Sequence, residues 1–241
     1  MISTRRLEAL PDIPDLIRIT KGLATLDAIL CAERQYRYYS FNRRWNPSDP
    51  AEMMASMRDG CGDEFFILFS PAGAAIKGFA HESFMSPHGN DLFTPVEQHG
   101  WLLYPGMLAN FPDRLRPFLA EPAFVLSDAS FVVWRRTGDS AWRIGDMAWP
   151  SAEQLDAYYG SSGYRDADGS EELLSPLAGR PEDYVAWASE YFEVSISVAD
   201  AAHVLALRPL DHALLLRLGS ERSLAELRDD LDEIGYPLAA G

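Results

Sequence analysis

Cysteine is scarce in this chain of 241 residues, which contains only Cys31 and Cys61. The two lie far apart in the sequence and form no CxxC pair, so neither a disulfide framework nor a cysteine zinc site is expected. We expect reduced thiols and a cytoplasmic protein of bacterial type.

Long apolar runs are also absent, since none approaches the roughly 20 residues that span a bilayer. Residues 1–10 contain Arg5 and Arg6 but no apolar core and no small-residue cleavage site, so we expect no signal peptide. With 47% hydrophobic and 24% charged residues, the composition is that of a folded protein. We therefore expect no contact with a membrane and a single domain over residues 1–241.

Basic residues are much less frequent than acidic ones. The chain has 21 basic residues, of which only Lys21 and Lys77 are lysines, against 36 acidic ones, and its formal net charge is −15. Residues 1–60 carry nine basic and eight acidic side chains, whereas the rest of the chain carries 12 and 28. Repulsion from so acidic a body argues against binding to nucleic acid and permits a basic protein partner.

The common catalytic and cofactor motifs are missing. The sequence contains no GxSxG, no P-loop and no dinucleotide-binding fingerprint. This removes the enzyme classes that are easiest to recognise, although it does not exclude an enzyme. We expect no cofactor.

What the chain does contain is a β-hairpin between Asp59 and Ser86. An apolar, aromatic-rich run at 64–69 predicts one strand, Ser-Pro-Ala-Gly at 70–73 a turn, and 74–81 a second strand. The two outer ends of such a hairpin lie at the same edge of the sheet, where carboxylates and a histidine could form an acid–base pair. The candidates are Asp63, Glu64, His81 and Glu82. The alternative, which we favour, is that these residues cap turns and face solvent.

Three histidines, His81, His88 and His99, are the weak candidates for metal ligands. Two histidines and a carboxylate can bind zinc. Their spacing matches no helix-borne HExxH motif, however, and glycine and proline intervene. We therefore predict no metal site and interpret the three as polar surface residues.

One basic and aromatic segment, residues 34–45, stands out in the acidic chain. It contains four arginines, five aromatic residues and no acid. Stacking and charge could together bind an anionic ligand or a single strand of nucleic acid. The alternative, which we favour, is a strand whose aromatic residues enter the core and whose arginines pair with the acidic body. The candidate binding residues are Tyr36, Arg37, Tyr39, Arg43, Arg44 and Trp45.

The rest of the pattern predicts an α+β fold. A second hairpin, with strands at 131–136 and 141–147, would place Trp134 opposite Arg143. Apolar spacing predicts a helix over 15–33, and residues 150–241 are mainly helical. We also expect a short helix over 50–57 and a short strand over 194–198. The predicted architecture is an antiparallel sheet built from two central β-hairpins, with packed helices and a mainly helical C-terminal part.

The segments YRYYSFNRRW (36–45) and MASMRDGCGDEFFILFSPAGAAIKGFAHES (54–83) resemble a family of uncharacterised bacterial proteins. The distinctive shared pattern is SMRDGxGDExFxLF, and the likeness continues through FVVWRR, AWRIGD and DGSEELLSPLAGRPEDYVAWASEYFEV. The resemblance implies a bacterial protein but brings no established activity and no site residues.

Two functional hypotheses follow. The first is a non-enzymatic, acidic protein-binding module, similar in general character to immunity proteins that neutralise toxins. The alternative is a hydrolase-type or metal-dependent enzyme that uses the carboxylates and histidine near the first hairpin. A deep pocket with those groups converging on it would favour the enzyme.

Overall fold

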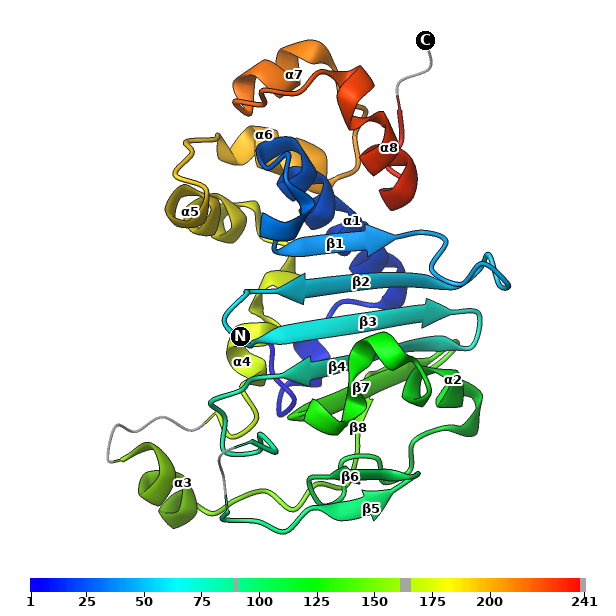
Figure 1. Cartoon of the computed structure of the whole chain (residues 1–241), viewed down its shortest axis with the longest axis vertical. Helices are drawn as coiled ribbons and strands as arrows, with labels where there is room; N and C mark the ends of the chain where they lie inside the picture. Colours follow the sequence, from blue (N-terminus) through cyan, green and yellow to red (C-terminus); the bar gives the residue numbers. More distant parts are fainter. Residues whose placement is uncertain (89–90, 161–165, 239–241) are drawn as a thin grey trace. The chain divides into compact units, whose positions relative to one another are not determined.

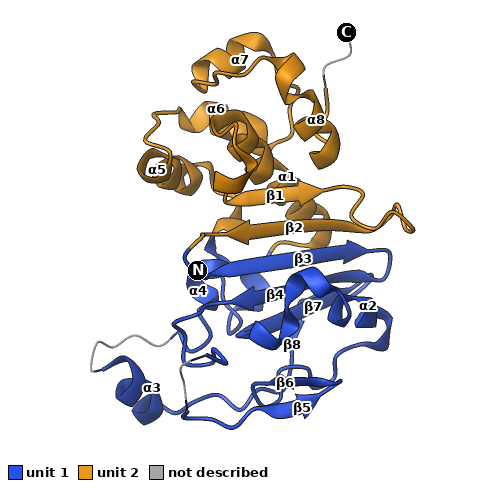
Figure 2. Cartoon of the chain, viewed as in Figure 1, with its two compact units in different colours: residues 1–10, 61–175 blue, residues 11–60, 176–241 orange. Residues whose placement is uncertain are grey.

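The computed structural model describes residues 1–88, 91–160 and 166–238. Its contacts group the chain into two compact units, and each unit draws on two separate stretches of sequence (Figure 2). Unit 1 comprises residues 1–10 and 61–175, and unit 2 comprises residues 11–60 and 176–241. The expectation of a single domain stays a prediction.

Unit 1 is built on a four-stranded antiparallel arrangement in the order β3, β4, β7, β8 (Figure 1). The strands are β3 (Glu64–Ser70), β4 (Gly73–Phe79), β7 (Phe131–Arg136) and β8 (Arg143–Ile144), with a separate pair β5 (Val96–Gln98) and β6 (Trp101–Leu103). The helices are η1 (Leu7–Ala9), η3 (Asp113–Leu115), α2 (Arg116–Leu119), η4 (Pro122–Phe124), η5 (Leu126–Asp128), α3 (Ala152–Tyr159) and α4 (Ser170–Leu173).

The first predicted hairpin is confirmed, and so is the second, except that its second strand is limited to Arg143–Ile144 and does not extend over 141–147. In the first, Ser70 pairs with Gly73 across the turn, and the register continues to Glu64 opposite Phe79. In the second, Trp134 lies opposite Arg143, as predicted. Gly73 is required where β4 meets β7, because a Cβ there would lie 2.2 Å from the carbonyl oxygen of Arg135.

Unit 2 packs helices against the antiparallel pair β1 (Tyr39–Asn42) and β2 (Met53–Arg58). Its helices are α1 (Ile13–Leu30), η2 (Arg34–Tyr36), α5 (Pro181–Tyr191), α6 (Val198–Leu205), α7 (His212–Arg217) and α8 (Leu224–Ile234). Helix α1 contacts β1, α6 and α8. It approaches α6 so closely at Gly22 that a Cβ on this residue would lie 2.8 Å from the Leu205 Cα. A short 3-10 turn, η6 (Ser175–Ala178), spans the point where the chain enters unit 2 for the second time.

Two local predictions are wrong. Residues 50–57 do not form a helix, because 53–58 is strand β2 and pairs with β1. The Asp49 carboxylate does not cap a helix there but accepts from the backbone N–H of Ala51 in a turn. Residues 194–197 form no strand, and α6 begins at Val198 with the Ser197 hydroxyl as its N-cap.

The α+β class and the antiparallel sheet are confirmed. The described part of residues 150–241 is mainly helical, as predicted. Capping boxes are present at Ser151 and Ser223, where α3 and α8 begin. Of the helices in the part of the chain that the structure describes, none is long and apolar enough to cross a membrane.

Candidate functional site

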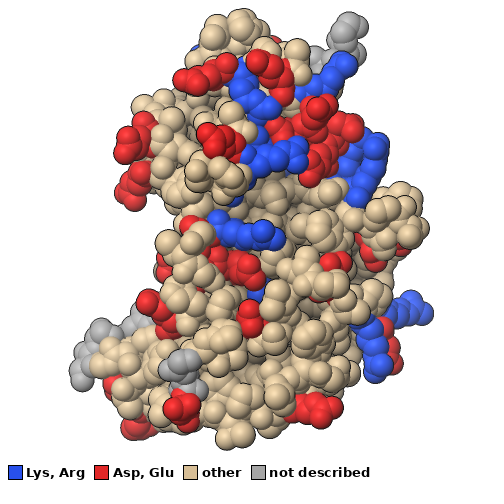
Figure 3. Space-filling model, in the orientation of Figure 1, with Lys and Arg blue, Asp and Glu red and all other residues tan. Residues whose placement is uncertain are grey.

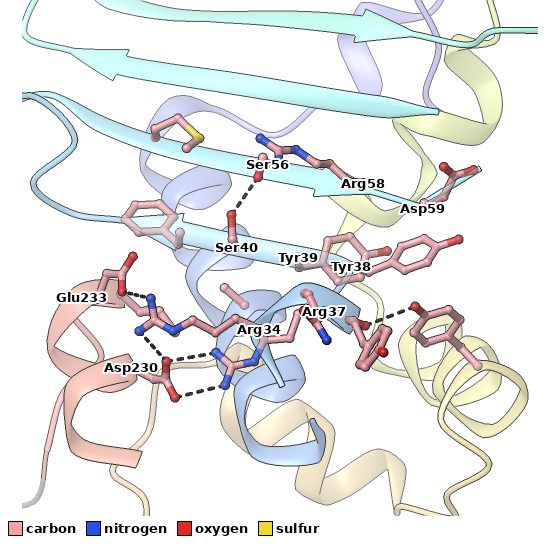
Figure 4. Close-up of a pocket in the computed structure, with 18 of the residues that line it drawn as sticks. Arg34, Arg37, Tyr38, Tyr39, Ser40, Ser56, Arg58, Asp59, Asp230 and Glu233 are labelled. Atoms are coloured by element: carbon pink, nitrogen blue, oxygen red, sulfur yellow. Dashed lines mark hydrogen bonds and ion pairs between the residues drawn. The ribbon is translucent and has the colours of Figure 1, made fainter. Parts of the chain in front are cut away.

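A pocket of about 570 Å³ opens in unit 2, bordered by β1, β2, η2 and α8 (Figure 4). This volume falls in the range of small-molecule and cofactor sites. The polar and aromatic residues that line it are Arg34, Gln35, Tyr36, Arg37, Tyr38, Tyr39, Ser40, Phe41, Trp45, Ser56, Arg58, Asp59, Tyr191, Asp230 and Glu233. The predicted basic and aromatic segment thus supplies one whole wall.

Asp230 on α8 holds this wall in place. Its carboxylate accepts hydrogen bonds from Arg34 Nη2 at 2.8 Å, Arg37 Nη1 at 3.0 Å and Arg222 Nη1 at 2.7 Å. The side chain is only 6% exposed. Burial opposes ionisation, but the bonds from Arg37 and Arg222 outweigh it and lower the pKa of Asp230 to about 2. The charged carboxylate therefore fixes residues 34–37 against α8.

A second buried carboxylate, Asp27 on α1, fixes the start of β1. Its Oδ2 accepts from the backbone N–H groups of Tyr38 and Tyr39 at 2.8 and 2.9 Å, and its Oδ1 accepts from the Tyr184 hydroxyl at 2.8 Å. Asp27 is completely buried. Burial raises the pKa of its carboxyl to about 7, although these three hydrogen bonds act in the opposite direction.

Aromatic rings form one side of the pocket. Tyr38 packs at 4.8 Å from Trp187 and 4.7 Å from Tyr191, whose rings stack on each other with an interplanar angle of 14°. The Tyr191 hydroxyl donates to the carbonyl oxygen of Tyr36 at 3.1 Å. Tyr36 and Tyr191 nonetheless remain 56% and 41% exposed. The rings are thus held in position and still accessible at the edge of the pocket.

Hydroxyl groups form part of the pocket surface on the strands. Ser40 on β1 and Ser56 on β2 are direct partners in the register, and their hydroxyl oxygens lie 2.7 Å apart. Figure 4 shows this pair between the Arg58 side chain and the cluster of Arg34 and Asp230. On the face of unit 2 seen in Figure 3, basic and acidic side chains lie next to one another.

Both interpretations of residues 34–45 describe part of what is observed. Tyr39 and Phe41 are buried, and Arg37 pairs with Asp230. This agrees with the alternative in which the aromatic residues enter the core and the arginines pair with acidic residues. Of the candidate binding residues, Tyr36, Arg37, Tyr39 and Trp45 line the pocket. Arg43 and Arg44 are outside its lining, and Arg43 pairs with Asp232 on α8. That the pocket binds anything stays a prediction.

Most residues that line the pocket were not among the candidates predicted from the sequence. The residues not predicted include Ser40, Ser56, Arg58 and Tyr191, and the anchors Asp27 and Asp230. One signal was present: four arginines without a nearby acid need counter-charges from elsewhere, and the chain has a dense acidic run at 229–233. Serines on neighbouring strands leave no such signal, because their pairing depends on the register.

At the first hairpin, the structure joins Asp63 and His81. Asp63 Oδ1 accepts from the His81 backbone N–H at 2.8 Å and lies 2.7 Å from His81 Nδ1. The Glu82 carboxylate lies 3.8 Å from His81 Nε2. The predicted meeting of the two hairpin ends is confirmed for these residues. A carboxylate on Nδ1 orients a histidine ring in the way that base–orienter pairs of hydrolases require.

Glu64 is directed elsewhere. Its Oε1 accepts from Lys77 Nζ at 2.6 Å, and Lys77 is fully buried on β4 between the rings of Phe66 and Phe79. A buried ammonium group needs a counter-charge. Glu64 therefore serves as that counter-charge, and the expectation that it faces solvent is wrong.

The three histidines have separate surroundings. His88 Nε2 lies 3.2 Å from Asp128, whereas His99 follows β5 and lines a second cavity of about 440 Å³ with Trp101 and Arg116. Within the described ranges, no group of three or more His, Cys, Asp and Glu side chains could hold a metal ion.

Comparison with protein-family models, with curated proteins and with solved structures gave no match. The resemblance of residues 36–45 and 54–83 to a bacterial family therefore stays a prediction.

Proposed function

We propose that this chain is a non-enzymatic binding protein and that the pocket of unit 2 is its recognition site. The observation that carries the proposal is the pocket itself, because it combines tyrosines, a tryptophan and arginines, the residue types most enriched at binding hot spots. Exposed Tyr36 and Tyr191 at its edge offer contact area that is already held in position.

The chemistry of the pocket favours binding over catalysis. Asp230 is fully occupied by three guanidinium groups, and its low pKa keeps it from exchanging protons near neutral pH. Glu233 pairs with Arg34 at 2.7 Å. These carboxylates hold the wall together and do not act as acid or base. The catalytic candidates of the first hairpin are not among the residues that line this pocket.

A protein is the partner we propose. We propose that the surface of this partner is basic. Electrostatic attraction to a chain with a net charge of −15 would increase the association rate of a positively charged protein. The chain would act in the cytoplasm, and its likeness to immunity proteins is one of general character.

A photo-crosslinking amino acid at position 36 tests the proposal in native cells. We expect one protein to be captured at this position and not at exposed Leu216 on α7. The capture should be lost in Arg58→Gln, which changes the pocket lining, and retained in Arg228→Gln, which removes an exposed charge of α8 outside the pocket. Capture that survives Arg58→Gln, or no specific capture together with turnover on a substrate panel, would contradict the proposal.

The pair of Asp63 and His81 supports a second candidate function, hydrolysis with His81 as general base. Hydrolysis of p-nitrophenyl acetate is a simple assay. Activity that is lost in both His81→Asn and Asp63→Asn would favour the enzyme. Equal background rates in the wild type and both variants would exclude this reaction.

A further inference from the structure

The groups that line the pocket of unit 2 define the kind of ligand that fits it. We infer that the pocket receives a neutral phenol ring, the side chain of a tyrosine on the partner protein. This inference rests on the proposed function, because it specifies which group the partner places in the site. It is carried by the pairing of charges in the pocket, by the apolar and aromatic walls, and by a pair of serine hydroxyls.

The charged groups of the pocket are engaged within the chain. Among the described residues, those that line the pocket carry three charges of each sign, on Arg34, Arg37, Arg58, Asp59, Asp230 and Glu233. Arg34 pairs with both Asp230 and Glu233, and the three nitrogens of Arg37 donate to Asp230 and to two backbone carbonyl oxygens. Arg58 and Asp59 also have partners in the chain. A charged ligand would lose its hydration without meeting an unengaged counter-charge on this described lining, so the pocket favours a neutral one.

The apolar and aromatic walls account for the ring. Phe41, Met54 and Ile234 line the pocket and are at most 5% exposed. At its edge, Tyr36 and Tyr191 keep much of their surface accessible. An aromatic side chain packs well against such rings, offset or edge to face. A cavity of about 570 Å³ also has room for a whole aromatic side chain.

The serine pair accounts for the hydroxyl of the phenol (Figure 4). The hydroxyl oxygens of Ser40 and Ser56 lie 2.7 Å apart, and among the residues that the structure describes neither has a further hydrogen-bond partner. One hydroxyl donates to the other, so the pair keeps an O–H to donate and lone pairs to accept. Ser56 is only 6% exposed, which limits its access to water. A phenol hydroxyl donates and accepts, and therefore matches the pair better than an indole N–H, which only donates.

A neutral side chain is compatible with a basic partner. The attraction between the partner and the acidic chain acts over the Debye length, about 8 Å at physiological salt, and mainly raises the rate of approach. The seating of one ring depends on the groups that it touches. A tyrosine flanked by basic residues meets both requirements, because its ring enters the pocket while the neighbouring charges stay in solvent.

NMR titration of the full chain with four ring probes tests the inference. The probes are p-cresol, which is the isolated tyrosine side chain, toluene, the anion p-toluate and the cation p-methylbenzylammonium. We expect p-cresol to bind about three- to tenfold more tightly than toluene, the factor that one neutral hydrogen bond supplies. Each charged probe should bind about tenfold more weakly than p-cresol, or not at all.

Variants assign the effect to named groups. In the double variant Ser40→Ala with Ser56→Ala, p-cresol and toluene should bind equally, because both hydroxyls are removed and neither is left unpaired. Tyr36→Leu should weaken both probes about threefold, because it removes a ring at the edge of the pocket. Arg228→Gln, on the exposed side of α8 and outside the pocket, should change neither.

Tighter binding of either charged probe than of p-cresol would overturn the inference of a neutral ligand. Equal binding of p-cresol and toluene to the wild type, or a preference that survives the double variant, would overturn the role of the serines. Absence of binding by all four probes would overturn the whole inference, while crosslinking at position 36 still decides the proposed function separately. A tripeptide with tyrosine between two arginines should bind more tightly than p-cresol. A tripeptide that binds no more tightly would overturn the protein side chain as the source of the ring.

Discussion

Replacing Asp230 with asparagine should test how the wall of the pocket is held. Asparagine keeps the shape of the side chain and has a similar helix propensity, so the effect on α8 itself is small. The substitution removes the negative charge that three guanidinium groups share. Arg37 is only 9% exposed, so its charge would be left in a poorly solvated position.

Two estimates give the size of the effect. The lowering of the Asp230 pKa from 3.8 to about 2 corresponds to about 2 kcal/mol in favour of the folded, ionised state. Removal of one partner from a buried ion pair typically costs about 3–5 kcal/mol. We therefore expect Asp230→Asn to lower the free energy of unfolding by about 2–4 kcal/mol. Arg34, whose side chain is 58% exposed, should contribute less than about 1 kcal/mol, so Arg34→Gln is the matched control.

Urea unfolding followed by tryptophan fluorescence measures both variants at neutral pH. The pKa adds a second readout. Because the folded pKa lies below the unfolded value, the stabilisation by Asp230 is present above about pH 4 and is lost as the pH falls toward 2. Asp230→Asn should not show this loss. A cost below 1 kcal/mol for Asp230→Asn, or equal costs for the two variants, would refute the reasoning.

Three further predictions concern stability. For Asp27, the folded pKa of about 7 lies above the unfolded value of 3.8, so its stabilisation is full below about pH 4 and about 4 kcal/mol of it is lost by pH 7, about 3 kcal/mol of this above pH 5. Asp27→Asn should remove this fall in urea titrations at pH 5 and 8, and the same pH dependence in both proteins would count against it. Glu64→Gln should destabilise unit 1 by about 3 kcal/mol, because it removes the negative charge beside the buried Lys77. Lys77→Met should be neutral or stabilising, because it removes the buried charge itself. Thermal unfolding measures both variants, and a larger loss of stability in Lys77→Met would contradict this interpretation. Gly22→Ala should lower the free energy of unfolding by about 1–3 kcal/mol, because the added Cβ would clash with the Leu205 backbone. Helix propensity alone predicts an increase of about 1 kcal/mol. The sign of the measured change therefore shows whether the close packing of α1 on α6 or helix propensity dominates.

Local pattern was sufficient for much of the fold. The apolar run at 64–69 and its Ser-Pro-Ala-Gly turn form the first hairpin, and the capping boxes at Ser151 and Ser223 begin helices. These features depend on neighbours a few residues apart, so they can be read without tertiary information. The contact between the Asp63 and His81 side chains could also be predicted from the sequence, because a hairpin brings its two outer ends together.

Predictions failed where a distant partner outweighs local preference. Residues 53–58 contain three methionines, which favour a helix, but pairing with β1 makes them a strand. Glu64 was expected to face solvent, but it pairs with the buried ammonium group of Lys77, whose burial cannot be read from neighbouring residues.

By itself, the sequence determined that this chain is an acidic α+β protein with two central hairpins, and that residues 34–45 are its one basic and aromatic segment. Tertiary structure decided that this segment becomes the wall of a pocket. Asp230, nearly 200 residues away, pairs with Arg34 and Arg37, and Asp27 fixes the backbone of Tyr38 and Tyr39. The physical reason is that burying charge and backbone polar groups requires partners, and only the folded chain shows which distant residues supply them.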